Sequence, residues 1–199
     1  MAGSPITASC GPASSTAWTP ISPKSRRGSR MALSNKVLER LDDQTLSIAR
    51  SFDAPPELLF RLWADPAHRV RWWGPSGLAP STCEVDYRVG GAWRVVMQGV
   101  GYDHPVGGVF TEIVEFSRLC FTYINDADGH EMLVEMDFVP EGHGTRMFFT
   151  QAPFLNVSER DGHRYGWTST LSMLATYAIK VRDSGTGEPL GEPRKPGDY

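Results

Sequence analysis

The sequence predicts an α+β domain in which a curved antiparallel β-sheet wraps around one long C-terminal helix. Three observations predict it. Within residues 53–77, directly after a strand-like run, two short helices carry three tryptophans. Short alternating runs separated by Gly, Asp, Pro and Ser come next, a pattern typical of antiparallel strands joined by hairpins. One strong amphipathic helix then follows near the C-terminus.

The first strand is expected in the run 44–52. Leu46, Ile48 and Phe52 are two or four residues apart, so they lie on one face of an extended chain. Arg50 interrupts this face, and the opposite face carries Ser47, Ala49 and Ser51. This alternation predicts a strand with one buried side.

Two short helices follow the first strand. Asp53 offers an N-cap for the first, and Pro55 and Pro56 suit its opening turn. Asp65 and Pro66 repeat these signals for the second helix, which ends before a Gly-Pro pair. The apolar face of the first helix consists of Leu59, Leu62 and Trp63.

Six further strands are expected at regular spacing. Each run alternates apolar and polar residues and is bounded by turn residues. Together they predict the antiparallel sheet. The runs are Ser81–Tyr87, Ala92–Gln98, Val106–Phe116, Arg118–Ile124, Met132–Pro140 and Thr145–Gln151.

The last element is a helix that begins near Ser158, which forms a capping-box-like start with Asp161. Gly166 lies inside this helix, where a glycine costs about 1 kcal/mol relative to alanine. A close backbone approach or a gap beside the helix would explain the glycine. The apolar stripe, which we expect to pack on the sheet, is Trp167, Leu171, Leu174, Ala178 and Val181.

The domain organisation follows from these elements. Residues 44–182 form the folded domain, and residues 183–199 are rich in Gly and Pro and are expected to be a flexible tail. Residues 1–40 are expected to be a disordered extension or a non-native one ahead of a start at Met31. A transit peptide is the alternative, but four prolines would break its amphipathic helix.

Composition excludes several classes of protein. No apolar run approaches the roughly 20 residues of a membrane span. Residues 1–40 hold six Lys/Arg and one Glu, so 14 basic and 22 acidic residues remain from Leu41 onward, which disfavours nucleic-acid binding. The cysteines Cys10, Cys83 and Cys120 form no CxxC pair. A soluble, cytoplasmic protein in a reducing compartment is expected.

Five runs resemble a known family, the START-like (SRPBCC) superfamily, in the branch similar to the C-terminal domain of the Aha-type activator of heat-shock-protein ATPase. The resemblance covers about residues 44–181. No single motif is diagnostic, but the order and spacing of the runs are. They are PELLFRLWADPAHRVRWWGP, VGGAWRVVM, GGVFTEIVEFSRLCFTY, GTRMFFTQ and GWTSTLSMLATY.

The resemblance implies a helix-grip fold with an internal cavity for an apolar ligand, and a link to the stress response. It implies little about chemistry, because the superfamily includes lipid carriers, cyclases and hormone receptors. Aha-type activators have a substantial additional N-terminal domain, whereas the 44 residues ahead of the match here have a tail-like composition. Direct activation of a chaperone is therefore in doubt.

Strand parity, together with the resemblance, predicts which side chains line the cavity. Residues two apart share a face, so an inward Trp93 brings Met97 with it, and the other strands follow the same rule. The alternative is that these side chains simply fill a core. The candidate ligand-binding residues are Trp93, Met97, Phe110, Glu112, Phe121, Tyr123, Met136, Phe149, Gln151, Trp167 and Leu171.

Glu112 is the candidate with the most chemistry. Parity with Phe110 would aim its carboxylate into apolar space, where it needs a partner or a raised pKa. The alternative is a carboxylate at the rim, paired with an arginine such as Arg94 or Arg146, or exposed on a bent strand. No catalytic residue is assigned.

Other motifs carry no visible chemistry. The five histidines lack metal-ligand spacing, so no metal or other cofactor is expected. His130 and His143 are expected in solvated turns, and His104 is not expected to reach the cavity mouth. No GxSxG motif is present, and Cys83 and Cys120 are expected to be buried, inert thiols. Trp72 and Trp73 could gate the pocket, but burial of at least one is favoured.

Three functions remain open. The first is a soluble binding protein that holds a small apolar or amphipathic ligand between the sheet and the C-terminal helix, without catalysis. The second is a cyclase- or hydrolase-like enzyme that uses the same pocket with Glu112 or a Tyr as acid or base. The third is a co-chaperone-like activator that binds a partner ATPase through its surface. The ligand, the partner and the oligomeric state are not predicted.

Overall fold

The computed structural model describes residues 38–41, 43–125 and 129–197, all of which belong to one compact unit, Asn35–Tyr199. Most of the predicted N-terminal extension, residues 1–37, lies outside the described residues. Leu38–Arg40, expected to belong to that extension, instead form a strand together with Leu41 that pairs with the next one.

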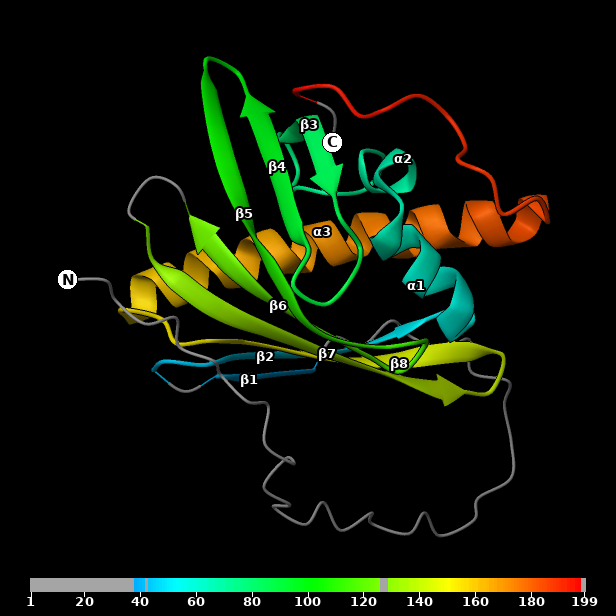
Figure 1. Cartoon of the computed structure of the whole chain (residues 1–199), viewed down its shortest axis with the longest axis horizontal. Coiled ribbons are helices and arrows are strands. Elements are labelled where there is room, and N and C mark those ends of the chain that lie inside the picture. The colour runs from blue at the N-terminus through cyan, green and yellow to red at the C-terminus, as the bar shows by residue number, and fades with distance from the viewer. Residues whose placement is uncertain (1–37, 42, 126–128, 198–199) are drawn as a thin grey trace, which may run out of the picture. The chain divides into compact units, whose positions relative to one another are not determined.

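The strands of the described segments form a single antiparallel sheet of eight, in the order β1-β2-β8-β7-β6-β5-β4-β3. Figure 1 shows the strand and helix positions. The strands are β1 (Leu38–Leu41), β2 (Leu46–Phe52), β3 (Ala79–Val85), β4 (Ala92–Gly99), β5 (Tyr102–Val114), β6 (Arg118–Asn125), β7 (Glu131–Glu141) and β8 (Gly144–Ala152). The helices are α1 (Pro56–Ala64), α2 (Pro66–Arg69) and α3 (Val157–Ser184).

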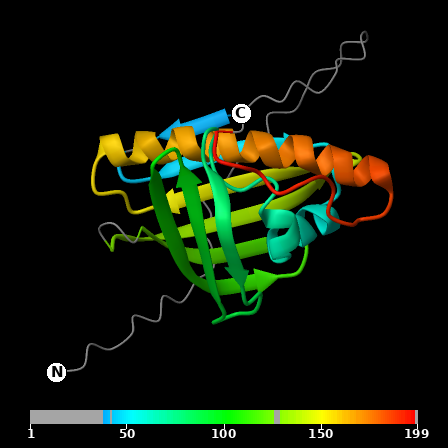
Figure 2. The ribbon, with the colours of Figure 1, turned by 90° about the horizontal axis from the view of Figure 1, so that it is seen from above.

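The sheet curves around α3, as the sequence predicts. Strands β3, β4 and β5 turn away from the direction of β2 and β8, and α3 runs along the hollow side (Figures 1 and 2). The side chains on this side alternate with outward ones. Along β2, for example, buried and partly buried residues alternate. The core therefore lies between the sheet, α3 and the α1–α2 pair.

The α1–α2 pair closes one side of the hollow. Trp63, Trp72 and Trp73 are all buried, with ring centroids 4.8 to 5.5 Å apart. Trp72 Nε1 donates a hydrogen bond to the carbonyl of Leu62 at 3.1 Å. The tryptophans of this segment are therefore buried and do not form an exposed binding surface.

The caps of the helices differ in part from the prediction. Asp65 caps α2 as expected, accepting a bond from the Ala67 amide at 2.7 Å. Pro55, and not Asp53, is the N-cap of α1, because the chain becomes helical only two residues later.

The predicted cap of α3 is also wrong. The N-cap is Asn156, two residues before the predicted cap Ser158. Asn156 Oδ1 accepts a bond from the Glu159 amide at 3.0 Å, and the Glu159 carboxylate accepts one from the Leu155 amide. This pair resembles a capping box with Asn156 as the cap, except that the Glu159 carboxylate bonds to the amide of the residue before the cap.

The segment after α3 runs back beside the helix (Figures 1 and 2). Asp183 and Ser184 still belong to α3, and Gly185 ends it with a φ of 67°. Arg194 then donates to the carbonyls of Trp73 and Gly74 at 2.8 and 2.9 Å. The segment expected to be a flexible tail is thus hydrogen-bonded to the loop after α2.

Candidate functional site

A cavity of about 220 Å³ lies between α3, the loop after α2 and strands β4 to β6. Its walls come from three segments that are far apart in sequence. The lining residues are Trp73, Gly74, Pro75, Leu78, Met97, His104, Tyr123, Gly162, His163, Gly166, Trp167 and Thr170.

Two glycines of α3 border the space, Gly166 half-buried and Gly162 exposed. Gly162 and Gly166 are four residues apart, so they lie one above the other on the same face of the helix. Outside the helix's own backbone, no described heavy atom lies within 4 Å of the position a Cβ would take at either residue. Gly166 therefore borders a gap. A gap beside the helix, and not a close approach of another backbone segment, explains this glycine.

The apolar wall consists mainly of aromatic rings. Trp73 and Trp167 meet edge to face, with centroids 5.5 Å apart. Trp167 also packs on Phe149, at 4.7 Å, and lies 6.1 Å from Tyr123. Met97 of β4 completes this side and is 4 % exposed. The cavity thus has rigid walls with one adaptable methionine.

A hydrogen-bond chain orients His163. Trp167 Nε1, which can only donate, is 2.7 Å from an oxygen of Gln151, so that oxygen is an acceptor. His163 Nδ1 lies 3.1 Å from the same oxygen and must donate to it. In its neutral form the imidazole therefore carries its proton on Nδ1. Gln151 is buried and orients two residues of the cavity wall.

Three further polar side chains line the cavity. Tyr123 is 6 % exposed, and its burial raises the pKa of the phenol, so that it stays neutral at physiological pH. Thr170 of α3 is buried. His104 lies on β5 opposite Met97, so it does reach the cavity that we expected it not to reach. Polar groups from the sheet and from α3 thus border the same, mostly apolar cavity.

Of the predicted ligand-binding residues, Met97, Tyr123 and Trp167 line the cavity. Gln151 lies behind them and holds His163 and Trp167. The remaining apolar candidates are buried but contribute to the core rather than to the lining, and are Trp93, Phe110, Phe121, Met136, Phe149 and Leu171.

The sequence reasoning missed most of the helix side of the cavity. His163, Gly162 and Thr170 were not proposed, and Trp73 was considered only as a gate. One signal was available: a second glycine, Gly162, lies one turn before Gly166 in an otherwise strong helix. Two glycines at this spacing indicate a bare helix face.

Glu112 does not point into the cavity, contrary to the parity argument. The pairing of β5 with β6 shifts by one residue between Phe110 and Glu112, so Thr111 is an extra residue in a β-bulge. Phe110 pairs with Phe121 and points inward, whereas Glu112 pairs with Cys120 and points outward. The bulge reverses the parity beyond Phe110.

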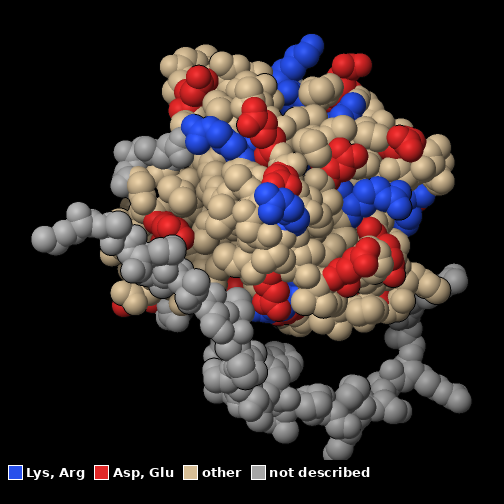
Figure 3. Space-filling model, in the orientation of Figure 1, with Lys and Arg blue, Asp and Glu red and all other residues tan. Residues whose placement is uncertain are grey.

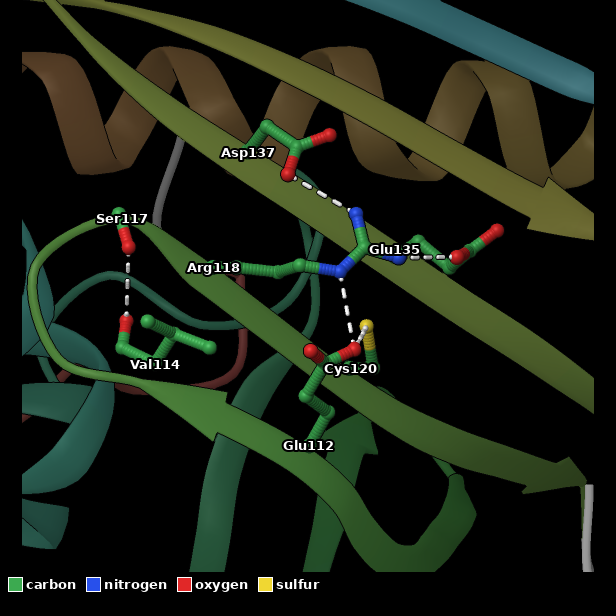
Figure 4. A network of polar contacts seen from close by, with 7 residues as sticks. All are labelled: Glu112, Val114, Ser117, Arg118, Cys120, Glu135 and Asp137. Atoms are coloured by element: carbon green, nitrogen blue, oxygen red, sulfur yellow. Dashed lines mark hydrogen bonds and ion pairs between the residues drawn. The ribbon is translucent and has the colours of Figure 1, made fainter. Parts of the chain in front are cut away.

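Figure 4 shows Glu112 in a charged network on the outer face of the sheet. Arg118 bonds to Glu112 at 3.0 Å, to Asp137 at 2.9 Å and to Glu135. Partial burial lowers the pKa of Arg118, but the hydrogen bonds that Arg118 donates to Asp137 and Glu112 outweigh it and raise the pKa overall. Arg118, which the sequence did not suggest, is thus a partner of Glu112.

Arg69 of α2 is buried and only 1 % exposed. Its guanidinium packs over the rings of Trp63, Trp73 and Trp93, 4.9 to 5.9 Å from their centroids. Nη2 donates to the Trp63 carbonyl at 2.7 Å, while Nε and Nη1 have no acceptor in the described part of the chain. Burial lowers the pKa of Arg69 to about 10.

Other candidate chemistry has a structural explanation. Cys120 is buried, and burial raises the pKa of the partly buried Cys83. His130 is not the solvated residue we expected, because its Nε2 is 2.8 Å from the Pro153 carbonyl. Within residues 38–41, 43–125 and 129–197, no group of three or more His, Cys, Asp or Glu is arranged to hold a metal ion. The described residues also include no helix long and apolar enough to cross a membrane.

Charges are mixed on the face of the molecule shown in Figure 3. Acidic and basic side chains are interspersed there, with much uncharged surface between them. This face offers no extended field of one sign.

Comparison with known proteins identifies the family. Residues 53–178 match the model of the family described as "Activator of Hsp90 ATPase homolog 1-like protein", which is more than half of the chain. The chain belongs to this family. No curated protein sequence matches it.

Solved structures share the fold. Protein CV1439 from Chromobacterium violaceum is 28% identical, with a TM-score of 0.61, over 67% of this chain and 95% of that one. The AHSA1 (SPO3351) protein from Silicibacter pomeroyi is 29% identical, with a TM-score of 0.60, over 70% of this chain and 99% of that one. This AHSA1-like protein has the START-like helix-grip fold, as the resemblance implied.

Proposed function

We propose that this AHSA1-like protein binds one small, mostly apolar molecule in the cavity beside Gly162 and Gly166. The observation that carries the proposal is the unfilled space next to the half-buried Gly166, with the exposed Gly162 at its edge. In a helix packed only for stability, each of two interior glycines would lower the stability by about 1 kcal/mol relative to alanine, with no compensating gain. Space for a ligand accounts for both.

The cavity limits the size of the ligand. A dry cavity of about 150 Å³ accommodates benzene. A volume of 220 Å³ therefore fits a molecule of one or two rings, or a short branched chain, and is small for a whole lipid. Trp73 and Trp167 favour a flat ligand that can stack on an indole.

The polar lining selects amphipathic molecules over pure hydrocarbons. The imidazole of His163, oriented by Gln151, borders the cavity and is a polar group that a ligand can contact. The neutral phenol of Tyr123 and the hydroxyl of Thr170 can either donate or accept. A phenol, an indole or a small hydroxyketone has the right combination of ring and polar group.

The alternatives lose support. The enzyme hypothesis needed an acid or base inside the cavity, and Glu112 is outside it, bonded to Arg118. Tyr123 remains inside, but its raised pKa disfavours a role as base. For the co-chaperone-like function, the family name is the only support. We therefore retain ligand binding without catalysis, in a cytoplasmic setting, as the proposal.

The test is to fill the cavity from the helix side. Gly166→Leu places a side chain in the open space, and we expect it to abolish binding of 1-naphthol or indole, measured by quenching of tryptophan fluorescence. Tyr165→Leu is the matched control, because Tyr165 is 68% exposed on the same helix turn. It should bind like the wild type.

Two results would overturn the proposal. One is that the wild type binds none of a panel of one- and two-ring phenols, indoles and ketones, and carries no small molecule in native mass spectrometry. The other is that Gly166→Leu, folded by circular dichroism, binds the probes as tightly as the wild type. In either case the cavity would be a packing defect.

A further inference from the structure

The buried guanidinium of Arg69 lies close to the cavity, although Arg69 is not one of the lining residues. Its Cζ is 4.9 Å from the ring centroid of Trp73, and the indole of Trp73 lines the cavity. Trp73 also meets Trp167, which belongs to the helix side of the lining. Trp73 is therefore in contact with both the guanidinium and the cavity.

Arg69 keeps its positive charge at physiological pH. Burial lowers its pKa only to about 10. The groups whose charges act on Arg69 are Cys83 and Tyr87, and burial raises the pKa of both, that of Tyr87 to about 12. Both are neutral at pH 7, so neither supplies a counter-charge. Among the described residues, no ion pair with an Asp or Glu involves Arg69.

A buried cation without a counter-charge needs an explanation. Moving a charge from water into a protein interior is unfavourable unless the charge is paired and fully hydrogen-bonded. The three indoles around Arg69 offset part of this cost through cation–π contacts. However, the Trp63 carbonyl is the only acceptor that Arg69 has in the described part of the chain. A methionine would fill the same space without the charge, so packing alone does not explain an arginine here.

The lining of the cavity offers a negative group no repulsion. Within the described ranges, no Asp or Glu borders the cavity. Tyr123 and Thr170 bring hydroxyl groups, which can donate hydrogen bonds to an anion. A negative group in the cavity would therefore meet hydroxyl donors directly and the positive charge of Arg69 through Trp73.

We propose that the ligand of the cavity is an aromatic acid bound as its anion, with Arg69 as the counter-charge. This inference rests on the proposed function, because it requires an occupied cavity. The ring of the ligand packs on the indoles of Trp73 and Trp167. Its carboxylate is attracted by the guanidinium, since charges inside a protein are screened less than in water. Arg69 does not touch the ligand, and it determines specificity through Trp73.

The binding experiment compares two probes of the same shape, 2-naphthoate and 2-naphthamide, which differ by one negative charge. The full chain is titrated with each probe at pH 7.5 in an isothermal titration calorimeter. We expect the wild type to bind 2-naphthoate more tightly than 2-naphthamide. Added salt should change the ratio of the two affinities little, because the protein's charge is buried.

Two substitutions separate the charge of Arg69 from its packing. Arg69→Met removes the charge and keeps an unbranched apolar side chain. It should weaken 2-naphthoate binding about tenfold, the order expected for unit charges roughly 10 Å apart at an effective dielectric constant of about 20. Binding of 2-naphthamide should be unchanged. Arg69→Lys restores a positive charge and should recover most of the preference for 2-naphthoate.

Arg88→Gln is the matched control for charge removal. Arg88 is an exposed arginine that pairs with Asp86 and does not line the cavity. This substitution should leave the affinities for both probes unchanged.

A measurement on the wild type remains decisive if the Arg69 variants do not fold. The Nε–H group of Arg69 is buried and has no acceptor in the described part of the chain, so its NMR signal is a local reporter of an added negative charge. The Nε–H signal should shift with 2-naphthoate, and much less with 2-naphthamide. Equal shifts with the two probes would contradict the proposal.

Three further outcomes would overturn it. One is equal affinity of the wild type for the two probes. Another is a folded Arg69→Met variant that keeps the preference for 2-naphthoate. The third is an equal loss of 2-naphthoate affinity in Arg88→Gln, which would show a general charge effect. Binding of 2-naphthamide alone would remove this inference and leave the proposed function intact, whereas binding of neither charged nor uncharged probes would remove both.

Discussion

The two halves of α3 meet the rest of the protein in different ways. Between Gly162 and Thr170 the helix borders the cavity, with two glycines where side chains would otherwise fill the space. Between Leu171 and Val181 it is packed, and the inward side chains are at most 7 % exposed. The first half thus leaves space for a ligand, and the second holds the helix to the sheet.

This difference shows how one helix can combine a binding site with stability. A cavity lowers stability because its lining loses packing contacts. The packed second half offsets that loss, since each fully buried leucine contributes about 1.5 to 3 kcal/mol. The ligand site can therefore be altered without unfolding the protein, as long as the second half is intact.

The largest effect is expected in the packed half. Leu174 is fully buried, and Leu174→Ala should lower the free energy of unfolding by about 2 to 5 kcal/mol, because it leaves a new void. Chemical denaturation monitored by circular dichroism measures it. Variants that remain folded should still bind the cavity probes. A loss below 1 kcal/mol would mean that the second half is not the anchor.

The sequence predicted the elements of the fold well. Every predicted strand from Ser81 onward overlaps an observed one, and both predicted short helices and the long helix are present. These predictions succeed because period-two and helical patterns report directly on which face is buried. The caps were less accurate. The choice between Ser158 and Asn156 depends on where the chain turns, and both residues are good caps.

The site was less predictable, for two physical reasons. Parity failed at Glu112 because one extra residue, Thr111, reverses the faces of β5, and nothing in the local sequence marks that bulge. Burial alone also does not separate lining from core. Trp93 and Trp167 are both at most 5 % exposed, but only Trp167 borders the unfilled space. That distinction depends on packing across the whole core.

A smaller effect is expected from Gly166→Ala in the cavity half. A methyl group at this position meets no neighbouring atom, so only the backbone gain of alanine over glycine remains. We expect the free energy of unfolding to rise by about 1 kcal/mol. The melting temperature checks it. Leu174→Ala and Gly166→Ala should thus change stability in opposite directions, and a destabilised Gly166→Ala would mean that the first half is already tightly packed.

The smallest effect concerns a contact that ties the packed half to the segment after it. His68 Nε2 lies 3.2 Å from the Gly187 carbonyl, which can only accept, so Nε2 carries the proton. Tyr177 of α3 accepts a bond from the Leu190 amide and therefore donates to His68 Nδ1, at 2.9 Å. The chain of bonds is complete only while His68 is neutral.

Burial is the main cause that lowers the pKa of His68 below its usual 6.5; Arg61 and Arg71 add to it, and Asp65 and the Gly187 carbonyl oppose it. The unfolded chain thus binds a proton more readily than the folded one as the pH falls through 6.5. Stability is therefore lost toward acid, by less than about 1 kcal/mol at pH 6.0 relative to pH 7.5.

His68→Gln isolates this contribution, because it removes the titrating group while the other histidines remain. Its free energy of unfolding should depend less on pH between 7.5 and 6.0 than that of the wild type, measured by chemical denaturation. In the wild type, the protection factor of the Leu190 amide should fall over the same range, since that amide depends on the Tyr177 hydroxyl. An unchanged pH slope in His68→Gln would show that protonation of His68 does not loosen the contact between α3 and the segment that follows it.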